Sequence, residues 1–232
     1  MVGKVSGRLE YGRLLLVTLC FTVFLWAYAL PQQAYSPPEV TSAGDAYTSY
    51  NIVFDGLFVL DIGIGDDGNI RRIESLRNPG SMLGAAKTSV RKWKFQPAFE
   101  DRKPRASRLT VAFVYRPANY PTFGAVPPKD FTPVIPSAQS DDGSEDCAPI
   151  GILSFAYPDY PVNSVVWGSV LLQATVDSAG DVKSVNVLHG MANFDRFAQG
   201  ALKNWRFRAA TLHGRPVTSK IVVAFIFQPP PS

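Results

Sequence analysis

The sequence predicts an α+β protein of two small β-β-α-β modules, each a three-stranded antiparallel sheet with one helix packed on a face, behind an N-terminal hydrophobic helix. Three observations lead to this prediction: a long internal repeat, turn signals between short apolar strands, and one uncharged apolar run near the N-terminus. The 232 residues are 46% hydrophobic and 18% charged, with a formal net charge of +4. A chain with this much apolar and this little charged sequence is not wholly disordered.

An internal repeat covers most of the chain. The tryptophan-centred phrases at residues 91–95 and 203–207 are closely similar and lie 112 residues apart. The same offset relates residues 56–117 to residues 168–229 without a gap, and it brings glycines, prolines and a Val-Ala-Phe run into register. Because the register holds at both ends and in the middle, the repeat indicates a duplication.

Each copy begins with two short strands. Residues 57–64 and 170–176 are apolar runs, and each is followed by a turn rich in aspartate and glycine. Residues 70–76 and 182–188 supply the second strands. The turn chemistry between the strands predicts a hairpin at the start of each copy.

An amphipathic helix and a third strand complete each copy. Apolar side chains recur at helical spacing through residues 82–93 and 194–205. Two polar residues are placed as the N-caps of these helices, Ser81 and Asn193. Residues 108–115 and 220–227 are rich in β-branched and aromatic side chains, which favour strands. Three strands with a helix across one face can bury a core, whereas an isolated hairpin is marginal.

Composition divides the chain into five segments. The part between the copies holds six of the 19 prolines and an acidic stretch, and this composition is typical of a linker that is extended in part. Both modules, in contrast, are basic. The predicted segments are residues 1–30 for membrane targeting, 31–49 for a short linker, 50–117 for the first module, 118–150 for the acidic linker and 151–232 for the second module.

The apolar run near the N-terminus decides the compartment. Residues 14–30 carry no charge, and Lys4, Arg8 and Arg13 precede them. By the positive-inside rule, the N-terminus stays cytoplasmic and everything after the run is exported. Two interpretations remain open: a retained single-pass anchor, or a signal peptide cleaved at residues 27–29 to release a soluble protein.

No motif for catalysis, a cofactor or a metal is found in the sequence. Residues 63–68 spell G-x-G-x-x-G, but the chain continues as a strand where a dinucleotide site needs a helix, so a hairpin turn is the better interpretation. His189 and His213 have no further histidine or cysteine at metal-ligand spacing. We therefore expect no enzyme, no cofactor and no metal site, and export argues against a nucleic-acid partner.

The second copy resembles the C-terminal domain of TonB proteins. The motifs that carry the resemblance are Tyr157-Pro158, Gly168-Ser169-Val170, Asp177-Ser178-Ala179-Gly180, Trp205-Arg206-Phe207 and Val223-Ala224-Phe225-Ile226-Phe227. The resemblance covers about residues 152–228 and, in a more divergent form, residues 50–117.

The resemblance implies a bacterial envelope protein that carries energy to outer-membrane transporters. TonB proteins are anchored in the inner membrane with the C-terminal part in the periplasm, and the ExbB–ExbD motor drives them. Their C-terminal domain captures a short transporter segment, the TonB box, as an added strand. The implied binding edge is the last strand with the Tyr-Pro segment nearby, and its residues are Ser219, Ile221, Val223, Phe225, Phe227, Tyr157 and Pro158. The apolar side chains of the strand are expected in the core, so the binding edge concerns its backbone.

A second function remains open beside this one. The family's membrane helix uses a histidine for motor coupling, and residues 14–30 contain none. About 20 residues separate this run from the first module, which is short for a spacer across the periplasm. The alternative is a non-transducing periplasmic adaptor or structural protein that uses the same modules for protein–protein binding or dimerisation.

Overall fold

The computed structural model describes residues 35–46, 55–78, 80, 82–117, 130–159 and 167–228. Tyr35–Ser232 form one compact unit. The apolar run at residues 14–30, predicted as an anchor or a signal peptide, lies outside the described residues. Within the described part of the chain, no helix is both long and apolar enough to span a bilayer.

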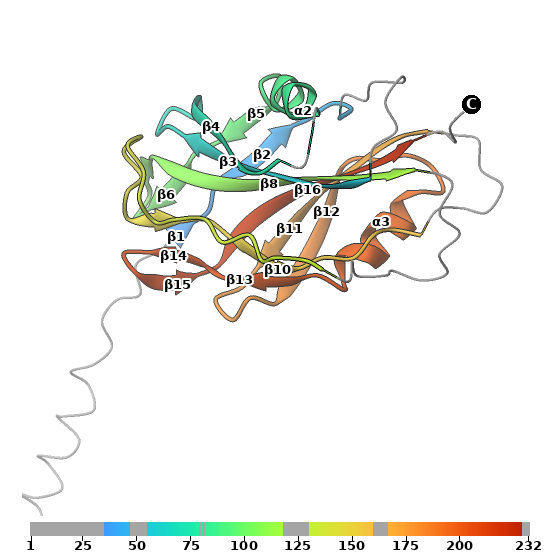
Figure 1. The fold of residues 1–232 in the computed structure, drawn as a ribbon. Coiled ribbons are helices and arrows are strands. Elements are labelled where there is room, and N and C mark those ends of the chain that lie inside the picture. The colour runs from blue at the N-terminus through green and yellow to red at the C-terminus, as the bar shows by residue number, and fades with distance from the viewer. Residues whose placement is uncertain are drawn as a thin grey trace, which may run out of the picture. The chain divides into compact units, whose positions relative to one another are not determined.

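The centre of the molecule is one continuous sheet of six long strands (Figure 1). In sheet order these are β12 (Val182–His189), β11 (Gly168–Val176), β16 (Ser219–Gln228), β8 (Ser107–Pro117), β3 (Gly56–Ile64) and β4 (Ile70–Arg77). Neighbouring strands are antiparallel except at the centre, where β16 and β8 run parallel from Ile221 opposite Thr110 to Gln228 opposite Pro117. Each module therefore supplies three adjacent strands, and the two halves join edge to edge.

The shared sheet corrects the expected layout of the modules. The α+β class agrees with the sequence prediction, and the long elements of each repeat follow the predicted β-β-α-β order with three short strands inserted after the helix, but the modules do not form two separate three-stranded sheets. Left alone, the last strand of each module would expose a long apolar edge of unpaired N–H and C=O groups. Pairing β8 with β16 satisfies these groups and joins the two halves into one layer.

One helix covers each face of this sheet. Figure 1 shows α2 (Leu83–Val90) and α3 (Asp195–Leu202) on opposite sides. Because the last strands of the two modules lie side by side and parallel, a half-turn about an axis along these strands relates one module to the other. This half-turn carries the helix of one module to the opposite face of the sheet. The parallel pair at the centre thus explains why each face receives one helix.

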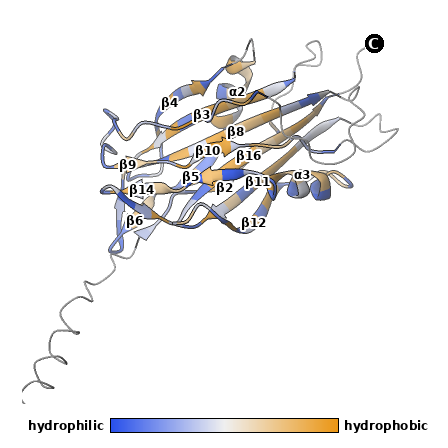
Figure 2. Cartoon of the chain, turned by 60° about the horizontal axis from the view of Figure 1, so that its bottom comes forward, coloured by the Kyte–Doolittle hydropathy of each residue, from blue (hydrophilic) through white to orange (hydrophobic). Residues whose placement is uncertain are grey.

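Side-chain alternation along the strands gives the sheet two cores, one on each face. In β3, Leu57 belongs to the core on the α3 side, whereas its neighbour Phe58 belongs to the core on the α2 side. Trp205 and Trp93 occupy matching places in these two cores and are nearly fully buried. Figure 2 shows the apolar residues concentrated along the central strands. Each buried large side chain contributes about 1.5–3 kcal/mol to folding.

The helix starts differ from the predicted capping. Neither helix has a side-chain cap hydrogen bond, and Asn193 adopts a φ of 69° just before α3. The carboxylate of Asp195 instead accepts the N–H of Met191 at 2.8 Å. Asn193 is therefore not the cap, because the chain turns sharply there, and Ser81 lies outside the described residues.

A short β-arm precedes the long strands of each module. In the first module, β1 (Tyr35–Ser36) pairs with β6 (Ala98–Glu100), and β2 (Glu39–Ser42) pairs with β5 (Lys94–Gln96). In the second, β9 (Cys147–Ala148) pairs with β14 (Ala210–Leu212), and β10 (Gly151–Ser154) pairs with β13 (Arg206–Arg208). Two further short strands, β7 (Lys103–Arg105) and β15 (Arg215–Val217), close the hairpins with β6 and β14. The arms keep the 112-residue offset, so parts of both predicted linkers are strands that belong to the repeat.

Each arm packs on the long strands of the other module. The N–H of Val40 donates to Oε1 of Gln173 at 2.8 Å, and the N–H of Ala46 donates to Oγ of Ser169 at 2.9 Å. In the reverse direction, the hydroxyl of Thr110 donates to the carbonyl of Ile150 at 2.6 Å. The modules are therefore interlocked by their arms as well as paired at their edges.

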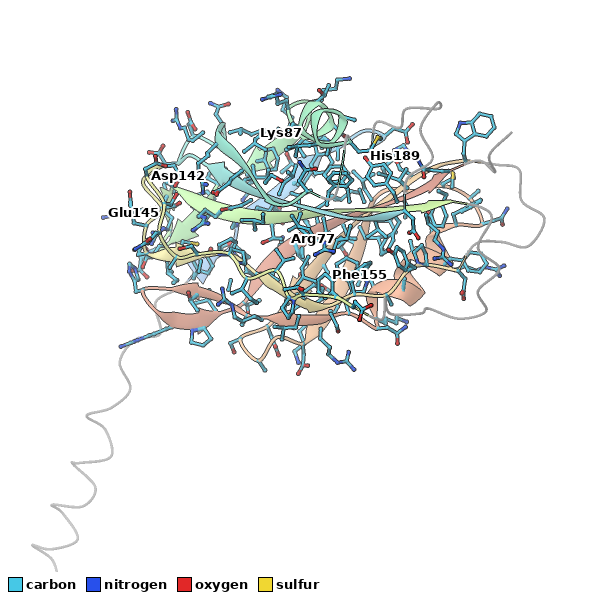
Figure 3. All side chains as sticks on the ribbon, viewed as in Figure 1. Arg77, Lys87, Asp142, Glu145, Phe155 and His189 are labelled. Atoms are coloured by element: carbon cyan, nitrogen blue, oxygen red, sulfur yellow. The ribbon has the colours of Figure 1, made fainter. Side chains whose placement is uncertain are left out.

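The acidic part of the predicted linker folds back onto the first module. The carboxylate of Asp142, which is labelled in Figure 3, accepts from the guanidinium of Arg72 at 3.0 Å, and Asp146 forms an ion pair with Arg105. These contacts neutralise part of the charge of the basic first module. Residues 137–146, named the acidic strap below, thus dock on the first module, a contact that the prediction of a linker extended in part did not include.

A buried ion pair lies beneath the acidic strap. Asp61 of β3 and Arg108 of β8 are 0% and 2% exposed and bond to each other. The guanidinium of Arg108 also donates to the carbonyl of Ser137 in the strap at 2.6 Å and to that of Cys147 at 3.2 Å. Two charges at this depth remain compatible with folding because nearly every polar atom has a partner.

The G-x-G-x-x-G sequence is a hairpin turn, as predicted. The N–H of Gly65 donates to the carbonyl of Asn69 at 2.8 Å, and the N–H of Gly68 donates to that of Gly65 at 3.0 Å. Gly68 has a φ of 78°, which favours glycine. The turn joins β3 to β4 and opens no helix.

Candidate peptide-binding edges

The strand predicted as the binding edge lies inside the sheet. β16 pairs with β11 from Ser219 to Phe227 and with β8 from Ile221 to Gln228. The prediction of an accessible backbone edge at Ser219, Ile221, Val223, Phe225 and Phe227 is therefore not met in this structure. The reason is the duplication itself, because the last strand of the first module occupies the place that an added peptide would take.

The side chains of this strand behave as predicted. Ile221, Val223, Phe225 and Phe227 are fully buried in the core on the α3 side. The ring of Phe225 packs edge-on against Trp205, with centroids 6.0 Å apart. These side chains stabilise the module and are not available to a ligand.

The Tyr-Pro segment belongs to the same core. The ring of Tyr157 packs edge-on against Phe155 at 5.0 Å, and the guanidinium carbon of Arg116 lies 5.0 Å from the centroid of that ring. Pro158 is buried. Burial raises the pKa of the Tyr157 phenol, so this group stays protonated across the physiological range. The structure thus brings Tyr157 to the core that holds β16, where it acts as a packing residue.

The end strands of the sheet, β4 and β12, have no strand paired beyond them in the described part of the chain. An end strand presents a row of N–H and C=O groups that can pair with an extended peptide. The two ends arise from repeat-related strands, but their side chains differ.

The β4 end is charged and partly covered. Arg72 bonds to Asp61 and Glu74 as well as to Asp142 of the acidic strap. Arg71 bonds to Asp67 of the turn at 2.8 Å. Charges of this kind on an edge strand protect it from pairing with other chains.

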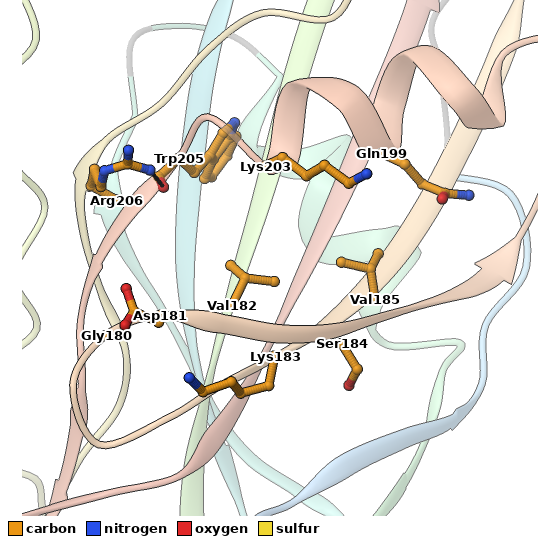
Figure 4. Close-up of a pocket in the computed structure, with 10 residues that line it drawn as sticks. All are labelled: Gly180, Asp181, Val182, Lys183, Ser184, Val185, Gln199, Lys203, Trp205 and Arg206. Atoms are coloured by element: carbon orange, nitrogen blue, oxygen red, sulfur yellow. Dashed lines mark hydrogen bonds between the residues drawn. The ribbon is translucent and has the colours of Figure 1, made fainter.

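The β12 end is less charged and borders a hollow of about 590 Å³ between the strand and α3 (Figure 4). Val182 and Val185 point from the strand towards the helix, whereas Lys183 and Ser184 point away from it. Further along, Val187 is 42% exposed. The hollow is lined by Gly180, Asp181, Val182, Lys183, Ser184, Val185, Gln199, Lys203, Trp205 and Arg206. The sequence prediction did not include this edge, although the three valines of β12, at positions 182, 185 and 187, indicate an apolar surface on the strand.

Basic side chains stand above the hollow. Lys203 and Arg206 are exposed, and neither forms an ion pair with a described carboxylate. Lys183 on the opposite side bonds to Asp177 at 2.8 Å. This hydrogen bond lowers the pKa of Asp177 to about 2 and raises the pKa of Lys183, so Lys183 is tied to its own turn.

The described residues contain no cluster of three or more side chains suited to hold a metal ion. The histidines serve surface contacts: His189 lies 2.7 Å from Asp45, and His213 lies 2.7 Å from Asp146. Cys147 is a buried free thiol whose pKa is raised by burial. A buried thiol held protonated is a poor nucleophile.

Comparison with known families supplies the decisive observation. The model of the Gram-negative bacterial TonB protein C-terminal family matches residues 54–117 and 154–229, which together make up more than half of the chain. The chain belongs to the TonB C-terminal family. Both matches fall on the repeats, so the TonB-like domain occurs twice in tandem, as the sequence predicted.

Membership of this family also fixes the broad class of the protein. TonB C-terminal domains are protein-interaction domains of the cell envelope and not enzymes. The chain is therefore a TonB-like protein connected with envelope transport. No curated protein sequence matches the chain significantly.

Proposed function

We propose that this TonB-like protein binds an extended segment of an outer-membrane TonB-dependent transporter by strand addition and so supports energy-dependent transport. The observation that carries the proposal is the tandem family match on an open six-stranded sheet. Strand addition needs an edge with unpaired backbone groups, and an open sheet supplies two.

At the edge implied by the family resemblance, strand β8 stands in the way of a peptide in this chain. A peptide that pairs with Ser219, Ile221, Val223, Phe225 and Phe227 must first displace β8, because β8 pairs with the same side of β16. A disulfide across these two strands tests this condition. Ala112 and Val223 are register partners, so the pair Ala112→Cys and Val223→Cys, with Cys147→Ser to remove the native thiol, would hold the strands together.

The proposal itself is tested by titrating residues 35–232 with TonB-box peptides from the same organism while backbone amides are followed by NMR. Binding with shifts along one strand supports strand addition. No shift at millimolar peptide, with the protein folded, would overturn it. That result would leave the alternative of a non-transducing periplasmic adaptor or structural protein that uses the same modules for protein–protein binding or dimerisation.

The location of the protein is a second part of the proposal. Residues 14–30 would anchor it in the inner membrane with the described unit in the periplasm. Mass spectrometry of the mature N-terminus separates this arrangement from a cleaved, soluble periplasmic form. Coupling to the ExbB–ExbD motor is the weakest part, since the apolar run lacks a histidine. Cross-linking in cells would test it directly.

A further inference from the structure

We propose that the free edge of β12, together with the hollow beneath α3, is the place where an extended peptide docks. The peptide would add a strand beside β12, direct apolar side chains towards α3, and direct an acidic side chain on the same face to Lys203 and Arg206. This inference rests on the proposed function and names the site and the peptide chemistry.

The first argument is access. β16 has a neighbour on both sides, whereas among the described strands β12 pairs only with β11. A peptide can therefore add to β12 without breaking any existing ladder. At β16 it must replace the eight register pairs that join β8 to β16.

The second argument is shape. Val182 and Val185 face α3 and are half-buried against the core on that side, and they form the floor of a hollow of about 590 Å³ (Figure 4). Residues two apart on an added strand would face the same hollow. A peptide with apolar residues at alternate positions therefore buries them beside the valines, close to Trp205.

The third argument is charge. Lys203 and Arg206 border the hollow on the helix side without a described carboxylate partner, while Lys183 is bonded to Asp177 on the other side. Asp181 also lines the hollow, but Lys203 and Arg206 outnumber it, so a carboxylate on the helix-facing side of the peptide would meet an excess of positive charge. Complementary charges of this kind increase association rates and select against basic partners.

The fourth argument is the contrast with the repeat-related edge. On β4, Arg72 occupies the position of Ser184 and bonds to the acidic strap. Ser75 stands where β12 has the exposed Val187. At these two positions β4 thus carries an arginine held by the strap and a polar serine, whereas β12 carries a small serine and an exposed valine, so β12 has less of the charge that protects an edge.

The experiment uses residues 35–232 and a labelled, threonine-rich octapeptide with valine at two alternate positions and glutamate at a third position of the same face. The matched control peptide carries lysine in place of glutamate. We expect the acidic peptide to bind more tightly, with amide shifts concentrated in residues 182–189. Equal affinity for both peptides, or shifts concentrated in β16, would overturn the inference.

Two pairs of variants test the site itself. Lys203→Glu should weaken binding about tenfold, the size of a near-surface charge effect, while Arg91→Glu at the repeat-related position beside α2 should leave it unchanged.

The second pair of variants tests the backbone of β12. Ser184→Pro and Val185→Pro each remove one backbone N–H. Because adjacent amides point to opposite sides of a strand, one of these variants should stay folded and lose binding. If both charge variants behave alike, or if the folded proline variant binds normally, the inference is wrong.

The disulfide between β8 and β16 distinguishes this inference from the proposed function. Peptide binding that survives the disulfide supports β12. Binding that the disulfide abolishes keeps the proposed function but overturns the β12 site. If neither the octapeptide nor the TonB-box peptides bind any variant, both fail. Amides of β12 that broaden with protein concentration alone would show that a second copy occupies the edge, which also overturns the inference.

Discussion

The two halves of the sheet share a fold and a 112-residue repeat, yet they end in different edges. Apolar positions match in the two cores, as Trp93 and Trp205 show. Polar positions have diverged. Where the first module has Asp61 paired with Arg108, the second has Gln173, whose amide receives the arm of the first. The comparison indicates that packing maintains the duplicated fold, while the polar positions differ in whether they contact the acidic strap or the arm of the other module.

The ion pair between Asp61 and Arg108 should give the largest difference in stability between the two halves. Asp61→Ala leaves the guanidinium of Arg108 buried without its carboxylate, and we expect a loss of about 3–5 kcal/mol in the free energy of unfolding. Gln173→Ala removes the acceptor of one buried N–H and should cost about 1–3 kcal/mol. Urea unfolding of residues 35–232 measures both.

A double variant checks the origin of the first effect. Asp61→Leu with Arg108→Met replaces both charges by apolar groups and should recover most of the stability. If Asp61→Ala alone costs no more than Gln173→Ala, the buried pair is not what distinguishes the two halves.

The turn glycines should give the next largest effect, with the same sign in both halves. Gly180 has a φ of 91°, and a Cβ there would lie 2.4 Å from the carbonyl oxygen of Phe207; at Gly68 the φ is 78° and the distance to the carbonyl oxygen of Phe95 is 2.7 Å. We expect either alanine variant to lose about 2 kcal/mol, with Gly180→Ala the worse, because backbone atoms must move. Gly200→Ala in α3 meets open space and should stabilise by about 0.5–1 kcal/mol. Thermal unfolding of the three variants measures these effects. A different order of midpoint temperatures would contradict the predicted roles of the three glycines.

Replacing Trp93 or Trp205 should lower the free energy of unfolding by amounts that differ less than those of the variants above. The indole N–H of Trp205 donates to the carbonyl of Ala156 at 3.1 Å, whereas that of Trp93 has no partner among the described residues. Trp205→Phe should therefore cost about 1 kcal/mol more than Trp93→Phe, the value of one net hydrogen bond. Equal losses in denaturant unfolding would show that this bond does not distinguish the cores.

The acidic strap should add a small pH dependence to the first half. Burial alone would raise the pKa of Asp142, but hydrogen bonds from Ser140, Ser144 and Arg72 hold the pKa below its ordinary value. A lowered pKa in the folded state means that this contribution to stability is complete above about pH 4 and is lost as the pH falls through the folded pKa. Asp142→Asn should remove this component. We would compare unfolding free energies of the two proteins from pH 6 to pH 3, where parallel curves would contradict the prediction.

The sequence by itself determined the repeat, the order of elements within it and the core positions. These are local properties, because apolar spacing and turn residues report on the strand or helix that contains them. The family resemblance followed from the same residues and was confirmed by the tandem match. The turn at Gly68 and the burial of Phe225 were predicted correctly for this reason.

Tertiary structure decided what lies beside each edge. The pairing of β8 with β16 joins residues more than a hundred positions apart, and no local pattern distinguishes an edge that a peptide occupies from one that the chain's own second copy occupies. The docking of Asp142 on Arg72 is long-range in the same sense. A strand can form backbone hydrogen bonds with any other strand of suitable length, so the sequence shows only that β16 needs a partner. The three-dimensional arrangement selects β8 as that partner, and among the described strands it places no second neighbour beside β12.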